Sequence, residues 1–141
     1  MIRRIDDRVA VAPQITAAEV AAIAHAGYAE IVNNRPDDEE PGQPSGAEIA
    51  AAAAEAGIGY RAIPVTHSGF SANQVEAMAS ALTAAGGPLL AYCRSGTRSA
   101  HLWALARARM GDDAEMLTAK ARAAGYDIGG IRAMLDTLAV R

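Results

Sequence analysis

The chain has 141 residues, 51 % of them hydrophobic, a formal net charge of −3 and a sequence pI near 5.5. That length and apolar content suffice for one core, so we expect residues 1–141 to form a single domain. The acidic balance argues against nucleic acid or an anionic membrane as a partner, because both call for a concentrated basic surface. No apolar run approaches membrane-spanning length and the first residues lack a signal-peptide core, which predicts a cytoplasmic protein.

The number of cysteines and the spacing of the histidines exclude several kinds of site. Cys93 is the single cysteine, which excludes an internal disulfide and a dithiol mechanism. The three histidines, His25, His67 and His101, are widely spaced and form no metal-ligand cluster. The sequence therefore predicts neither a metal nor another cofactor.

Apolar runs and capping patterns alternate along the chain. Four short apolar runs predict strands at residues 9–12, 28–32, 58–65 and 89–92. Helices are predicted to start after Thr16, Ser45 and Ser71, each followed three residues later by Glu or Gln. Three more are predicted at residues 100–110, from Asp112 (with Glu115) to about 125, and at 128–138.

This alternation predicts an α/β fold in which a parallel four-stranded sheet has helices on both faces. Ligands in such sheets bind beyond the carboxyl ends of the strands. We predict the strand order one, two, four, three, which places the loops after the second and third strands beside the loop after the fourth.

Residues 93–99, Cys-Arg-Ser-Gly-Thr-Arg-Ser, are the strongest candidate site. They join a predicted strand to a helix, whose first N–H groups and positive dipole end favour an anion. The same field favours the thiolate of Cys93, which we expect to be exposed at the mouth of the turn. We predict Cys93 and Arg98 as catalytic residues, and the anion-binding residues are predicted to be Arg94, Ser95, Gly96, Thr97 and Ser99.

Two further polar loops supply the candidate supporting residues. Asn33, Arg35 and Asp37 follow the second strand, and His67 follows the third. Each is a candidate acid or a support for the site. The alternative is a self-contained turn in which Asp37 caps or pairs with Arg35. The acidic run at residues 37–40 is interpreted as a solvated loop.

Three separated motifs carry a family resemblance: residues 33–37 (Asn-Asn-Arg-Pro-Asp), 63–65 (Ile-Pro-Val) and 87–105, which include the Cys93 loop. Together they resemble the small phosphatase-like domains of beta-lactamase-hydrolase-like proteins, which are found fused or adjacent to persulfide dioxygenases. The loop itself resembles those of cysteine-dependent phosphatases and rhodanese-type sulfur transferases. The resemblance implies a cysteine-phosphatase-like fold, and either phosphatase or sulfur transferase activity.

Loop length and the missing acid favour sulfur transfer over phosphatase activity. The phosphatase pattern has arginine six positions after cysteine, whereas Arg98 is five after Cys93, as in rhodanese. Phosphatases of this type also use an aspartate upstream of the cysteine, and residues 64–69 hold no carboxylate. Sulfur transfer needs no such acid, because sulfite or a thiolate is already a good leaving group.

The sequence therefore predicts a sulfur transferase that moves sulfane sulfur from thiosulfate or a persulfide, through a Cys93 persulfide, to an external thiol. A persulfide dioxygenase is a possible partner. The first alternative is a phosphatase acting on phosphotyrosine or a small phosphoester. The second is a non-catalytic anion-binding or partner domain of a persulfide dioxygenase.

Overall fold

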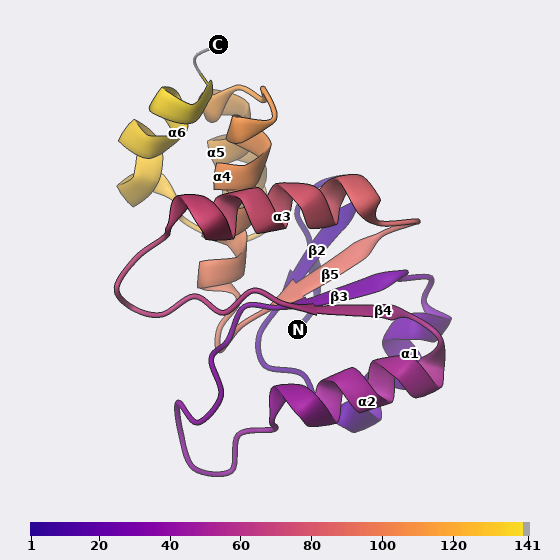
Figure 1. The fold of residues 1–141 in the computed structure, drawn as a ribbon. Coiled ribbons are helices and arrows are strands. Elements are labelled where there is room, and N and C mark those ends of the chain that lie inside the picture. The colour runs from indigo at the N-terminus through magenta and orange to yellow at the C-terminus, as the bar shows by residue number, and fades with distance from the viewer. Residues whose placement is uncertain (140–141) are drawn as a thin grey trace.

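A mixed sheet and its connecting helices make up the fold. The computed structural model describes residues 1–139. The strands are β1 (Arg3–Arg4), β2 (Val9–Ala12), β3 (Glu30–Asn33), β4 (Gly59–Ala62) and β5 (Leu89–Tyr92). The helices are α1 (Ala17–His25), α2 (Gly46–Ala56), α3 (Ala72–Ala84), α4 (Thr97–Arg109), α5 (Ala114–Ala123) and α6 (Arg132–Ala139), the last preceded by the 3-10 turn η1 (Gly129–Ile131) (Figure 1). The predicted α/β class is confirmed.

The strand order and count differ from the prediction. The sheet runs β1-β2-β5-β3-β4, so the four predicted strands lie in the order one, four, two, three. β1 is an additional strand, antiparallel to β2, while the other pairs are parallel. Both orders leave the partly exposed β4 at an edge, and the difference is an exchange of the two interior strands β3 and β5. Because β3 and β5 are both buried along their whole length, their burial does not distinguish the two places, and pairing between distant segments decides them.

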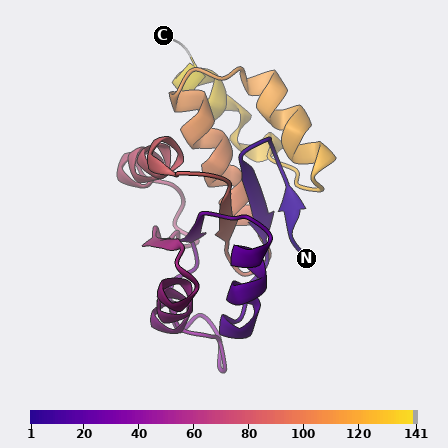
Figure 2. The same cartoon turned by 90° about the vertical axis from the view of Figure 1, so that its right-hand side faces the viewer.

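The two faces of the sheet carry separate cores. Successive strand residues point to opposite faces, so Leu89 and Ala91 pack with α3, α4, α5 and α6, while Leu90 and Tyr92 pack with α1 and α2. Figure 2 shows the sheet between these two helical layers. The central strand β5 thus leads into the Cys93 loop from a position covered on both sides.

Local capping patterns predict most helix starts correctly. Thr16, Ser45 and Ser71 each accept a backbone N–H from the first turn of their helix. The predicted cap of α5 is wrong by one residue: Asp113, not Asp112, accepts the Met116 N–H at 3.0 Å. The Asp112 carboxylate is instead engaged by the Arg107 guanidinium at 2.8 Å, so it is not free to cap.

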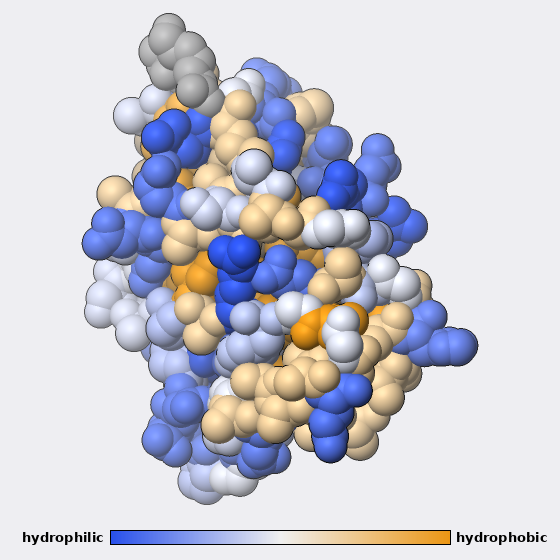
Figure 3. Space-filling view, turned by 45° about the vertical axis from the view of Figure 1, so that its right-hand side comes forward, coloured by the Kyte–Doolittle hydropathy of each residue, from blue (hydrophilic) through white to orange (hydrophobic). Residues whose placement is uncertain are grey.

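The surface is mixed in character. On the face in Figure 3, apolar residues gather in the lower part of the molecule, where Figure 1 places the alanine-rich helices α1 and α2. Within residues 1–139, no helix combines the length and the apolar character needed to cross a membrane.

Candidate active site

Cys93 lies at the junction between β5 and α4. Its N–H donates to the Ala12 carbonyl at 3.4 Å, so strand pairing continues to this residue. Its Sγ accepts the Gly96 N–H at 3.1 Å. The side chain is fully buried, so the expected exposure of the sulfur is wrong: the central strand delivers Cys93 below the surface, and the loop folds around it.

Gly96 is required by the shape of this loop. Its φ of 94° lies in the left-handed region, which side chains with a Cβ rarely adopt. A Cβ there would overlap the Tyr126 hydroxyl and lie 3.1 Å from Val11 Cγ1. Gly96 is also the N-cap of α4, and no side chain within the described residues caps that helix start. The Gly96 N–H faces Cys93 Sγ, and the Thr97 N–H donates to Ser95 Oγ at 3.4 Å.

Arg98 reaches across to two other loops. Nη1 and Nη2 donate to the two carboxylate oxygens of Glu39 at 2.7 and 2.8 Å, and Nη1 also donates to the Val65 carbonyl at 2.7 Å. The hydrogen bond with Glu39 is the main cause that raises the pKa of Arg98, and Cys93 contributes in the same direction. Arg98 is thus held beside the thiol as a permanent cation.

Glu39 lies between two arginines rather than in solvent. Besides Arg98, it accepts a hydrogen bond from Arg35 Nε at 2.9 Å, and its side chain is 18 % exposed. The hydrogen bond from Arg98, followed by that from Arg35, lowers the pKa of Glu39 to about 2 against the opposing effect of burial. The interpretation of residues 37–40 as a solvated loop is therefore wrong for Glu39.

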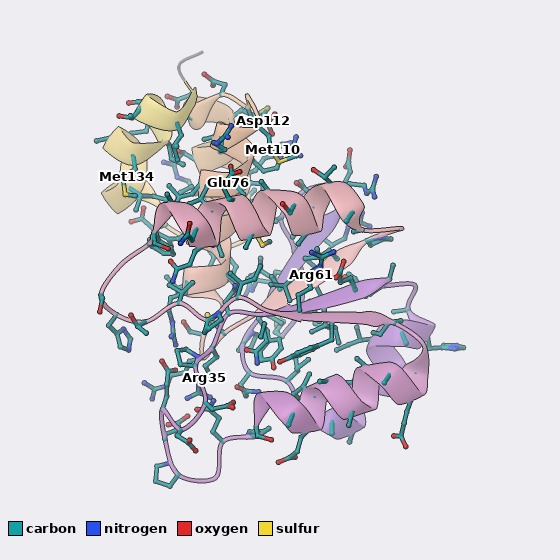
Figure 4. All side chains as sticks on the ribbon, in the orientation of Figure 1. Arg35, Arg61, Glu76, Met110, Asp112 and Met134 are labelled. Carbon is teal, nitrogen blue, oxygen red and sulfur yellow. The ribbon has the colours of Figure 1, made fainter. Side chains whose placement is uncertain are left out.

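Arg35 is the most buried charge of this cluster, with its side chain 2 % exposed. It also binds Glu40 at 2.9 Å and Gln14 at 3.1 Å. Figure 4 shows Arg35 at the start of the long loop that connects β3 to α2. Arg94 lies at the outer rim: its side chain is 68 % exposed and reaches Glu40 at 3.6 Å.

Ser99 joins the Cys93 helix to the β3 loop. Its hydroxyl donates to Asn34 Oδ1 at 2.8 Å, and Asn34 Nδ2 donates to the Ile63 carbonyl at 2.9 Å. Both side chains are buried. Asn34 is not among the predicted site residues, although its place immediately after β3 is a usable signal. No local signal pointed to Glu39, because its partner Arg98 is 59 positions away.

The remaining predicted supporting residues lie further out. Asn33 Oδ1 accepts the Arg35 N–H at 2.9 Å, which closes a local turn. Asp37 caps α2, accepting the Gly46 N–H at 2.8 Å. His67 is exposed, and its neighbour Val65 is the residue of that connection that contacts Arg98.

The side chains of Ser95 and Thr97 form the outer side of the loop. The Ser95 hydroxyl donates to Thr97 Oγ1 at 3.0 Å. Both residues line a hollow of about 380 Å³ together with Arg3 and Tyr126. Both residues therefore border this hollow, and their part in binding an anion near Cys93 stays a prediction.

Comparison with known proteins places this geometry in a family. A family model described as "Beta-lactamase hydrolase-like protein, phosphatase-like domain" matches residues 1–110. A beta-lactamase hydrolase-like protein of Xylella fastidiosa strain 9a5c is 34 % identical over 97 % of the chain. A second, from Agrobacterium fabrum, is 36 % identical over 74 %. The chain spans 32 % and 24 % of the length of these two relatives.

Solved structures show the same fold. The structure of a candidate phosphatase from Neisseria meningitidis Z2491 has a TM-score of 0.84 and 36 % identity, and the match covers 97 % of both chains. The active form of Tk-PTP has a TM-score of 0.75 at 19 % identity, covering 99 % of this chain and 97 % of that one. The fold is therefore phosphatase-like.

Proposed function

The chain belongs to the family of phosphatase-like domains of beta-lactamase hydrolase-like proteins, and we propose that it catalyses cysteine-dependent transfer of sulfane sulfur. The donor is a small anion such as thiosulfate or a persulfide, and the acceptor is an external thiol such as glutathione. Cys93 is the nucleophile. Arg98 and the backbone N–H groups of the loop bind the anionic donor.

The transfer takes two displacement steps. The Cys93 thiolate attacks the outer sulfur of thiosulfate, the S–S bond breaks, and sulfite leaves with the bonding electron pair. Cys93 then carries a persulfide. The acceptor is an external thiol, because the chain has no second cysteine to resolve the intermediate. Its thiolate attacks the outer sulfur of the persulfide, and Cys93 leaves as a thiolate.

This proposal is supported by the state of two carboxylates, Glu39 and Asp37, which are both held by other groups and do not serve as proton donors. Phosphoester hydrolysis needs a general acid to protonate an alkoxide leaving group. Glu39, with a pKa of about 2, is an anion at neutral pH and donates no proton. Asp37 is committed to the start of α2. Sulfite and thiolates leave without protonation, so the site as built suits sulfur transfer.

Phosphatase activity is the second candidate. It is favoured by the 36 % identity to a protein described as a candidate phosphatase. His67, exposed in the loop after β4, would then be the residue available to donate a proton.

One experiment separates the two candidates. The protein is incubated with thiosulfate and its intact mass is measured, in parallel with hydrolysis of an aryl phosphate. We expect the mass of one sulfur atom on wild type, its removal by glutathione, and no gain on Cys93→Ser. Aryl phosphate hydrolysis without any sulfur adduct would overturn the proposal and support the phosphatase.

A partner is also proposed. The relatives are several times longer than this chain, and we propose that a persulfide-oxidising enzyme supplies or consumes the transferred sulfur. Mixing the two proteins should accelerate persulfide turnover, and Cys93→Ser should remove that acceleration.

A further inference from the structure

The Glu39 carboxylate fills a preformed space between two arginines. Three hydrogen bonds hold it, from Arg98 Nη1 at 2.7 Å, Arg98 Nη2 at 2.8 Å and Arg35 Nε at 2.9 Å. The side chains of Arg98 and Arg35 are only 13 % and 2 % exposed. Two paired guanidinium groups in such a setting form a strong oxyanion site.

Both arginines keep other partners if Glu39 leaves. Arg98 also donates to the Val65 carbonyl at 2.7 Å. Arg35 also binds Gln14 at 3.1 Å and Glu40 at 2.9 Å. Glu39 is therefore the exchangeable member of the cluster, because its departure leaves both guanidinium groups held in place.

The position of this site is next to the reacting atom. Arg98 is the loop arginine beside Cys93, and Cys93 is one of the groups that raise the pKa of its guanidinium, after the hydrogen bond with Glu39. Glu39 itself comes from the connection between β3 and α2, which is outside the Cys93 loop. An oxyanion occupying the place of this carboxylate would lie against the same arginine that faces the thiol.

We propose that Glu39 holds the place of a substrate oxyanion, and that Arg35 joins Arg98 in binding that oxyanion once the Glu39 side chain turns out of the site. The inference rests on the proposed function only for the location of the reacting sulfur. The ligand class is a small tetrahedral dianion, either thiosulfate or a phosphate. Glu39 competes with the ligand for the two arginines. The apparent affinity for the ligand is therefore the intrinsic affinity multiplied by the fraction of molecules in which the Glu39 side chain has left the site.

Sulfate binding measured by calorimetry tests this proposal without turnover. Glu39→Gln is compared with wild type and with Glu40→Gln, a matched control that removes the neighbouring charge on the same arginine. We expect Glu39→Gln to bind sulfate at least about tenfold more tightly than wild type, and Glu40→Gln to gain much less. Thiosulfate and phosphate titrations then decide which source of dianion is preferred.

A second pair of variants keeps the test decisive if Glu39→Gln folds poorly. Glu39→Asp retains the charge on a shorter side chain that cannot span both arginines, so it too should bind sulfate more tightly than wild type. Arg35→Gln in either background should reduce that affinity. Equal or weaker sulfate binding by both Glu39 variants would overturn the proposal, and would show Glu39 to be a fixed structural partner of Arg98. Because sulfate is not turned over, this result is independent of whether sulfur transfer occurs.

Discussion

Removing the charge of Glu39 should destabilise the protein in a pH-dependent manner. The pKa of this carboxyl is about 2 in the folded protein, against an ordinary value of 4.5. Each pH unit of displacement corresponds to about 1.4 kcal/mol, which sets a ceiling of about 3 kcal/mol. Solvent at the partly open edge of the loop screens this interaction, and about 2 kcal/mol is the expected loss for Glu39→Gln at neutral pH.

The sign follows from the lowered pKa. A carboxyl that is more acidic in the folded state stabilises the fold above its unfolded pKa of 4.5, and that stability is lost as the pH falls toward 2. Urea unfolding of wild type and Glu39→Gln, followed by circular dichroism, should therefore give free energies that converge between these two values. Other carboxyls titrate in both proteins and cancel in the difference. A difference that stays constant with pH, or is absent at neutral pH, would refute the reasoning.

Three further predictions concern the scaffold of the site. Ser99→Ala should lower the free energy of unfolding in urea by about 1–3 kcal/mol, because Asn34 Oδ1 loses its buried donor. Gly96→Ala should lower it by about 2–4 kcal/mol through left-handed strain and overlap, whereas Gly86→Ala, with open space around it, should be nearly neutral in the same assay. Asp113→Ala should cost about 1 kcal/mol by thermal unfolding, as the loss of an N-cap does.

Local patterns predict the elements of this fold well. The starts of α1, α2 and α3 follow from one capping side chain and the residue three positions later, an interaction contained within a single turn. The strand before Cys93 follows from four apolar residues bounded by Gly87 and Pro88. These features depend on neighbours in the sequence, which is why a sequence alone reveals them.

Strand order depends on backbone pairing between segments that are far apart in the sequence. The predicted third strand spans residues 58–65, whereas β4 spans Gly59–Ala62, and Arg61 lies half-exposed against Glu30 at 2.7 Å. A strand with a charged side chain is suited to an edge, whereas the fully apolar β5 is suited to the centre. The predicted and observed orders both satisfy this rule, and they differ only in the places of β3 and β5, which are both buried throughout.

The acidic loop shows a different limit. Nothing in the spacing of Glu39 distinguishes it from its neighbours Asp38 and Glu40, yet only folding brings it to Arg98. Burial of Arg35 is equally hidden, because an arginine in a polar loop is ordinarily exposed. Ion pairs that close a site across the chain are set by tertiary structure, and composition predicts only that the charges are available.

The charge of the site, rather than that of the chain, determines which anions it can accept. The chain carries a net charge of −3, which disfavours the approach of an anion from a distance. Once the Glu39 side chain turns away, however, the guanidinium groups of Arg35, Arg94 and Arg98 remain, and the one carboxylate among them is that of Glu40, which pairs with Arg35 and Arg94. With Cys93 as the thiol, the local excess is two positive charges, which a dianion neutralises and a monoanion does not. The thiol form should therefore favour thiosulfate or phosphate over nitrate or acetate, and ionisation of Cys93 should reduce that preference.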